Sequence, residues 1–271
     1  DVLQVPAFLS RQTDLISDIR ANLDELSTRN SQLEREQATN TTFQKDVYPF
    51  LIGGRLQGRQ YALVMSATVP EEIRDSVVSS INVAGGQVIS TTVLDPRFNA
   101  GEMAEKINEA MAADPAFRKV DAATAAGWTG EARAPEIARA AEPRLLQLLK
   151  GSFVASVSGN YAAPVNGVIL LTYADNEQAP AYAEFEKQFV TTLRKSNVRV
   201  VAGEITTAPV SEIAIFQNTE TSTVDNLDSR MGQISLVFAL GGEGGSFGVK
   251  QTADMLIPIL REPQPLPPAG P

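Results

Sequence analysis

The sequence predicts an α/β fold: an N-terminal coiled-coil helix followed by one α/β domain, whose mostly parallel sheet is built from two similar βαβ units. The coil is predicted by apolar residues in 9–40 that recur about every 3.5 residues, a spacing that keeps one stripe facing a partner helix. The domain is predicted by two short apolar runs, 61–67 and 167–174, each followed by a helical segment and another apolar run. A buried strand, a helix and a second buried strand form a βαβ unit.

The predicted coil has a heptad register that follows from its apolar residues. With Ile16 at an a position, Asn30 also falls at a, Arg29 at g and Glu34 at the following e. A single Asn at an a position bonds its mate and favours two parallel helices, while g and e′ charges pair between them. We therefore predict a homodimer with an interface of Leu9, Ile16, Ile19, Leu23, Leu26, Asn30, Leu33, Arg29 and Glu34. The alternative is an amphipathic helix that lies on its own domain.

The end of the coil sets the domain boundaries. The a and d positions become polar after Leu33, and Pro49 with the Gly53-Gly54 pair stops the helix after about Asp46. The predicted organisation is a coiled-coil helix over 1–46, a globular α/β domain over 47–262 and a Pro-rich, disordered tail over 263–271.

The first βαβ unit consists of the strand 61–67, a helix over 70–84 and a strand over 87–94. Pro70 sits near the first turn of this helix, and Gly85-Gly86 ends it. The segments that follow are predicted as a helix over 101–113, a loop or short helices over 116–134, a helix over 135–150 interrupted by Pro143, and a loop over 151–164.

The second βαβ unit consists of the strand 167–174, a helix over 180–195 and a strand over 198–205. The helix carries one aromatic and aliphatic stripe, formed by Tyr182, Phe185, Phe189 and Leu193. The remaining segments are predicted as a strand over 212–218, a buried helix over 232–240, a flexible glycine-rich loop over 241–248 and a short helix over 252–260.

The composition excludes several classes of function. The 271 residues carry a net charge of −9 and include no basic stripe, which argues against a nucleic-acid partner because phosphates require clusters of Lys and Arg. The sequence contains no Cys and no His. It therefore has no thiolate nucleophile, no His-dependent triad and no Cys- or His-ligated metal site.

The remaining polar clusters do not predict a catalytic site. Asp225 and Asp228 could act as acid and base or hold a divalent cation, but helix capping and loop structure explain them better. Lys250 follows the glycine-rich loop without the spacing of a phosphate-binding loop. We predict no enzyme activity, no cofactor and no metal site.

Three stretches carry a resemblance to a known family: GRLQGRQYALV (54–64), VDNLDSRMGQISLVFAL (224–240) and FGVK (247–250). They resemble motifs of the MctB-like actinobacterial envelope family, which is labelled as a copper transport outer-membrane protein. The resemblance implies an extracytoplasmic chain, anchored to the inner membrane by an N-terminal helix that would precede Asp1. No run of 18 apolar residues occurs within the sequence itself.

The layout of a coil followed by an α/β domain is most similar to the corynebacterial SteB-type branch. That resemblance implies a regulator or scaffold of cell division that controls peptidoglycan hydrolysis, with a membrane partner of SteA type and a peptidoglycan hydrolase that bears a coiled coil. One alternative is a subunit of an envelope channel or copper-export system. A second is an enzyme that acts on envelope glycans.

Overall fold

The computed structural model describes residues 4–111, 117–139, 143–175 and 177–258, with the backbone alone for 4–18 and 21. The chain divides into two compact units, residues 1–48 and 49–271. The predicted tail over 263–271 lies outside the described residues.

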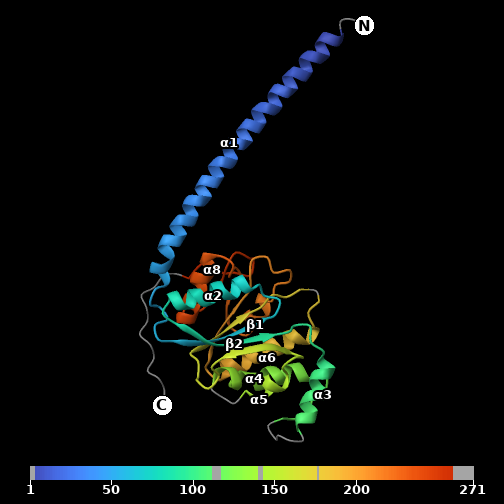
Figure 1. Cartoon of the computed structure of the whole chain (residues 1–271), viewed down its shortest axis with the longest axis vertical. Helices are drawn as coiled ribbons and strands as arrows, with labels where there is room; N and C mark the ends of the chain where they lie inside the picture. Colours follow the sequence, from blue (N-terminus) through green and yellow to red (C-terminus); the bar gives the residue numbers. More distant parts are fainter. Residues whose placement is uncertain (1–3, 112–116, 140–142, 176, 259–271) are drawn as a thin grey trace. The chain divides into compact units, whose positions relative to one another are not determined.

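The first unit is formed by most of a single long helix, α1 (Gln4–Ile52), which Figure 1 shows without a break. Its 49 residues correspond to a length of about 74 Å at the helical rise per residue. The helix continues past the predicted end at Asp46 and through Pro49. Pro49 lies in the last turn, so it removes one backbone hydrogen bond there without breaking the helix. Gly53 N–H donates to the Pro49 carbonyl at 2.8 Å and closes that turn.

The second unit contains one sheet, and its strands lie in the order β3-β2-β1-β4-β5-β6-β7 in the described part of the chain. Every neighbouring pair is parallel except β2 and β3, which are antiparallel. Leu63, at the centre of β1, pairs with Thr91 on β2 and with Ile169 on β4. The strands are β1 (Gln60–Ser66), β2 (Gln87–Leu94), β3 (Val154–Gly159), β4 (Gly167–Leu171), β5 (Arg199–Gly203), β6 (Ser222–Val224) and β7 (Ser246–Phe247).

Helices cover both faces of this sheet (Figure 1). The chain leaves β1 and β4 in opposite directions along the sheet, because β2 lies beyond β1 and β5 beyond β4. Right-handed crossovers then place α2 and α6 on opposite faces. The predicted α/β fold with two βαβ units is confirmed. The helices after α1 are α2 (Glu71–Val83), α3 (Ala100–Met111), α4 (Ala125–Ala138), α5 (Arg144–Leu148), α6 (Pro180–Lys195), α7 (Ile213–Gln217) and α8 (Arg230–Gly241).

The main hydrophobic core lies on the α4 and α6 side of the sheet. The apolar stripe predicted on α6 is buried, and Phe185 packs edge-on to Phe153 and stacks on Phe189, with ring centroids 4.8 and 5.6 Å apart. On α4, Gly130 lies against the α6 backbone. A Cβ at this position would lie 2.3 Å from the carbonyl oxygen of Phe185, so the two helices approach closely because residue 130 has no side chain.

Two predictions of local structure, the loop over 151–164 and the strand over 212–218, are wrong. The buried residues of each segment show why. The predicted loop over 151–164 contains β3, which buries Val154 and leaves most of its other residues exposed at the sheet edge. An edge strand with Ser and Gly has only a weak apolar pattern. The predicted strand over 212–218 is the short helix α7, which buries Ile213 and Phe216 at helical spacing.

The middle and the C-terminal part also differ from expectation. Helix α4 begins at Ala125, within the segment predicted as a loop or short helices, and includes Pro135. The described part of the predicted helix 252–260 forms turns, and Met255 bridges to Phe247. The glycine-rich segment 241–248, predicted as a flexible loop, contains β7.

Candidate functional site

The first candidate site is an apolar stripe on α1. The side chains of Ile19, Leu23, Leu26 and Leu33 are 48, 59, 63 and 55% exposed. Their spacing places them on one side of the helix at the predicted a and d positions. Aliphatic side chains of this size are usually buried, so a row of them in water indicates an unoccupied interaction surface.

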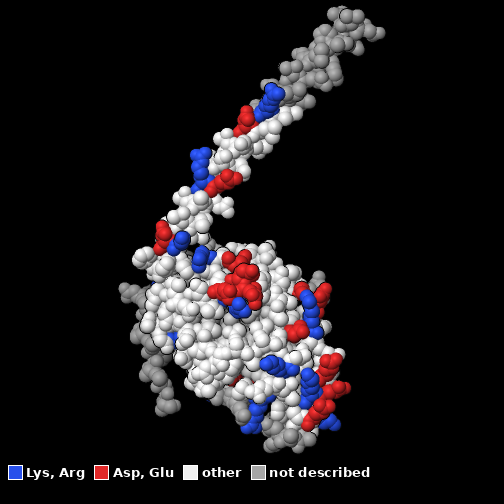
Figure 2. Space-filling view, viewed as in Figure 1, with Lys and Arg blue, Asp and Glu red and all other residues white. Residues whose placement is uncertain are grey.

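The polar residues of the predicted interface are also exposed. Asn30 Nδ2 donates to Glu34 Oε1 of the same helix at 3.2 Å. Among the described residues Arg29 forms no ion pair. Figure 2 shows Lys and Arg interspersed with Asp and Glu along the described length of α1, with uncharged surface between them. The Leu9 and Ile16 side chains lie outside the described residues, and pairing with a second chain stays a prediction.

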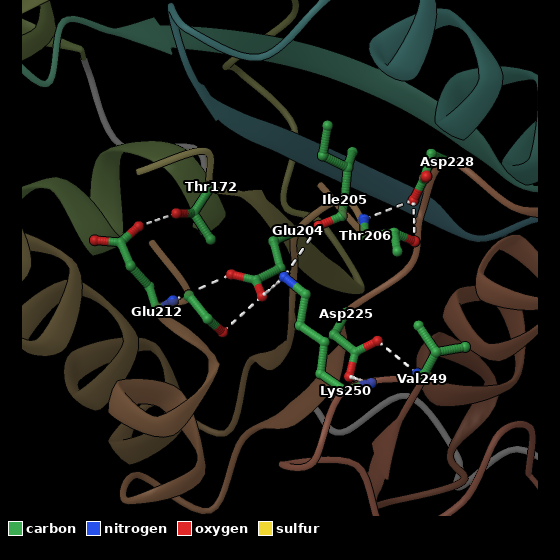
Figure 3. Close-up of polar contacts among 10 residues, drawn as sticks. Thr172, Glu204, Ile205, Thr206, Glu212, Asp225, Asp228, Val249 and Lys250 are labelled. Atoms are coloured by element: carbon green, nitrogen blue, oxygen red, sulfur yellow. Dashed lines mark hydrogen bonds and ion pairs between the residues drawn. The ribbon is translucent and has the colours of Figure 1, made fainter. Parts of the chain in front are cut away.

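The second candidate site is the polar edge of the sheet at the carboxyl ends of β4, β5 and β6 (Figure 3). Ligands of open α/β sheets bind along this edge. Thr172 follows β4 directly, Glu204 follows β5 and Asp225 follows β6. All three side chains are buried, so their polar atoms must be satisfied within the domain.

Glu204 is the centre of this edge. Its side chain is 1% exposed and accepts hydrogen bonds from Lys250 Nζ at 2.5 Å and from Ser211 Oγ at 2.6 Å. Its second oxygen accepts the backbone N–H of Glu212 at 3.1 Å. Lys250 Nζ also donates to the Ile205 carbonyl at 3.2 Å. The ion pair therefore ties β5 to the loop after β7.

Glu212 joins Glu204 to a second acid on α6. Its carboxylate accepts hydrogen bonds from the Thr172 hydroxyl and, at 2.6 Å, from Gln178 Nε2. Glu186 is fully buried, and its carboxyl group interacts with that of Glu212. Burial and the nearby Glu212 carboxyl raise the pKa of Glu186 well above its ordinary value, and burial also raises the pKa of Glu212. Glu186 is therefore held as the neutral acid.

Tyr182 is a second buried residue with a polar group, one turn before Glu186 on α6. Burial raises the pKa of this hydroxyl well above its ordinary value. The hollow at this edge is lined by residues that include Leu171, Glu204 and Leu227, and it has no room for a water molecule.

Asp225 and Asp228 hold loops in place. Asp225 is 1% exposed and accepts the backbone N–H groups of Val249 and Lys250 at 2.7 and 3.0 Å. Asp228 Oδ1 accepts the backbone N–H of Thr206 at 2.8 Å. The cap of α8 is the next residue, Ser229, whose side chain accepts the Gly232 N–H at 3.0 Å.

The sequence reasoning did not find Glu186, Glu204 and Glu212. Glu204 had a usable signal, since a charged residue directly after a buried strand lies at the edge where ligands bind. Glu212 lies in the segment 212–218, which was predicted as a strand, and Glu186 lies in the predicted helix over 180–195 but off its apolar stripe. Neither position has a local pattern that reveals its burial.

Neither candidate site has the composition of a resident metal centre. Within the described ranges, no group of three or more Asp, Glu, His or Cys side chains is placed to hold a metal ion. In the same part of the chain, none of the helices combines the length and apolar character needed to cross a bilayer.

Comparison with known proteins tests the resemblance found in the sequence. No curated protein matches the chain. Residues 2–258 match the model of the family described as "Copper transport outer membrane protein, MctB". This description fits an extracytoplasmic envelope protein linked to copper transport. The match covers α1 and every strand of the sheet, and the chain therefore belongs to the MctB family.

Proposed function

We propose that this chain is a non-catalytic, membrane-anchored scaffold outside the cytoplasm, which regulates cell division by controlling peptidoglycan hydrolysis through coiled-coil contacts. The observation that carries the proposal is the exposure of Ile19, Leu23, Leu26 and Leu33 along one side of α1. Fully burying one such side chain is worth about 1.5–3 kcal/mol. Association of the stripe with another helix therefore has a clear driving force.

The first partner in this proposal is a second copy of the chain, aligned in parallel by Asn30. Among the described residues, the side chain of Asn30 bonds Glu34 of its own helix. It can exchange that contact for the Asn30 of a second chain in a dimer. The same stripe can bind a helix of a hydrolase that bears a coiled coil, or of a SteA-type membrane partner. Amphipathic helices recognise one another by packing their apolar faces together.

The test places charged side chains in the apolar stripe of α1, which is the seam of the predicted coiled coil. The double variant Ile19→Asp/Leu26→Asp should reduce the mass of the full chain in solution from two copies to one over a concentration series, measured by light scattering. The matched control is Thr28→Asp/Gln32→Asp, which adds the same charge at exposed positions off the seam. A double variant that keeps the wild-type mass would contradict the dimer.

The cellular role needs a separate measurement. Affinity capture from an envelope extract should recover peptidoglycan hydrolases or division proteins with the wild-type chain and the control, and lose them with the seam variant. Capture of the same proteins by the seam variant would contradict a role for the coil in choosing partners.

A second candidate is a structural subunit of a copper-export system or channel, and the family description favours it. The chain has no Cys and no His, so its contribution would be assembly rather than thiolate or imidazole ligation. Copper titration calorimetry and conductance in planar bilayers test this candidate. Neither binding heat nor conductance would be expected if the scaffold proposal is correct.

A further inference from the structure

The domain has a second polar region, a pocket at the amino ends of the strands, opposite to the sheet edge that carries Glu204 and Asp225. It lies where β1 and β2 begin and α2 ends, and its volume is about 550 Å³, within the usual range for small-molecule sites. The side chains that line it are those of Gln57, Arg59, Gln60, Asn82 and Gln87. The stripe on α1 contributes nothing to it, so a ligand site in this pocket is independent of the proposed scaffold function.

The backbone around the pocket is fixed by hydrogen bonds between two turns. Gly58 N–H donates to the Gly85 carbonyl at 3.1 Å, and Gln87 N–H donates to the Arg59 carbonyl at 2.9 Å. Gly58 and Gly85 have φ of 72° and 82°, a conformation that glycine adopts without strain. The turns therefore fix the backbone positions from which the lining side chains extend, and the backbone does not have to be ordered when a ligand binds.

Four of the five lining side chains are carboxamides: those of Gln57, Gln60, Asn82 and Gln87. None of the four forms a hydrogen bond with the described residues. Each offers two N–H donors and one carbonyl acceptor. A Cβ on residue 85 would lie 2.5 Å from Gln57 Oε1, so the glycine leaves room for that amide beside the turn.

The charge of the pocket disfavours an anion. Asn82 belongs to the last turn of α2, the end at which the helix dipole is negative. Arg59 is the only charged side chain among the described lining residues. Its guanidinium already donates to the carbonyls of Leu240 and Gly241 at 3.1 and 3.5 Å, at the C-terminal end of α8.

We propose that this pocket binds an uncharged sugar. Sugar hydroxyls donate and accept at the same time, and amide side chains are matched to them because each amide also does both. A ligand rich in hydroxyl and acetamido groups can form hydrogen bonds with all four amides. A phosphate would have Arg59 as its one cationic partner, and the Arg59 guanidinium already donates to the carbonyls of Leu240 and Gly241. The geometry thus assigns to the domain a site for a neutral glycan unit.

The test is a titration of the full, 15N-labelled chain with N,N′-diacetylchitobiose, an uncharged disaccharide, followed by 1H–15N spectra. Saturable shifts should be concentrated in residues 57–60 and 82–87. The double variant Gln57→Ala/Asn82→Ala should weaken binding by about ten-fold, the loss of one to two neutral hydrogen bonds. The control Gln147→Ala, an exposed amide on α5, should leave the affinity unchanged.

Three results would overturn the proposal: no shifts at the pocket with excess disaccharide, shifts of other residues only, or shifts at the pocket with inorganic phosphate but not with the disaccharide. If the double variant does not give a folded spectrum, the single variant Gln57→Glu takes its place. It has nearly the same size but loses both N–H donors, so it too should weaken binding.

Discussion

Lys250 Nζ lies 2.5 Å from Glu204 Oε1, and this ion pair joins the end of β5 to the loop that follows β7. The Glu204 side chain is 1% exposed and that of Lys250 20% exposed. Glu204 also accepts hydrogen bonds from Ser211 and from the backbone of Glu212. A buried carboxylate with these partners is stable only while its cation remains.

Removal of the cation should therefore destabilise the domain strongly. Lys250→Met should lower the free energy of unfolding by about 3–5 kcal/mol, because an uncompensated charge stays buried. Urea denaturation followed by circular dichroism measures this. The matched control is Arg118→Met, which breaks an ion pair with Glu131 whose side chains are 61 and 59% exposed; its cost should be within about 1 kcal/mol. Equal effects of the two substitutions would contradict the structural role of Lys250.

The sign of the pH dependence of stability follows from Glu186. The unfolded chain releases this proton near the ordinary Glu pKa of about 4.3, while burial and Glu212 raise the pKa in the folded state. At a pH between the unfolded and the folded pKa of Glu186, the folded state therefore binds more protons than the unfolded state. The contribution of Glu186 is fully present below the unfolded pKa and is lost as the pH rises through the folded pKa, at up to about 1.4 kcal/mol per pH unit.

The variant Glu186→Gln should remove this loss. Its free energy of unfolding, compared with that of the wild type, should be similar at pH 4 and higher at pH 7–8, measured by urea denaturation across this range. The difference in the free energy of unfolding between variant and wild type cancels the contributions of carboxyl groups that do not interact with Glu186; it still includes Glu212, which does interact with it. Glu184→Gln, two residues away and 46% exposed, is the control and should show a difference that changes little with pH. A difference for Glu186→Gln that does not rise with pH would count against a buried neutral acid.

The fold was largely predictable because its central elements have strong, local patterns. Strands β1 and β4 are continuous apolar runs, and α6 has one aromatic stripe. The errors fall where burial depends on distant residues. Strand β3 exists because its backbone pairs with β2. Helix α7 comes from the four-residue apolar run 213–216, which is too short to distinguish a strand from a helix.

The site was less predictable for the same reason. The stripe on α1 could be read from sequence because a heptad repeat lies within one helix. The acidic cluster consists of Glu186 on α6, Glu204 directly after β5 and Glu212 directly before α7, and no spacing in the sequence predicts that these residues meet. The polar pocket lined by amides was unpredictable for the same reason. Gln57 and Asn82 become neighbours because the backbone N–H groups of Leu56 and Gly58 donate hydrogen bonds to the turn that follows α2.

Asn30 gives a test of the helix register. The substitution Asn30→Leu would place an apolar side chain at the predicted a position, where Asn costs stability but specifies the partner. We expect tighter association but a mixture of oligomers in sedimentation velocity, where the wild-type chain should give one species. Gln32→Leu adds the same side chain at an exposed position off the seam and should change neither property. An unchanged distribution for Asn30→Leu would show that Asn30 does not face a partner.

Gly130 tests the close packing of α4 on α6. A Cβ at residue 130 would lie 2.3 Å from the Phe185 carbonyl oxygen and 2.9 Å from the Phe189 nitrogen. The backbone of α6 cannot give way locally, so the helices must separate, and Gly130→Ala should lower the free energy of unfolding by about 1–3 kcal/mol.

Gly127, one turn earlier on the same helix, is the matched control because its added Cβ would meet only the Glu184 and Gln188 side chains, at 3.4 Å or more. Gly127→Ala should raise the free energy of unfolding by about 0.5–1 kcal/mol through helix propensity. If urea denaturation gives changes in the free energy of unfolding of opposite sign for the two substitutions, α4 contacts the α6 backbone at residue 130. The same sign for both would mean that the helices lie further apart there.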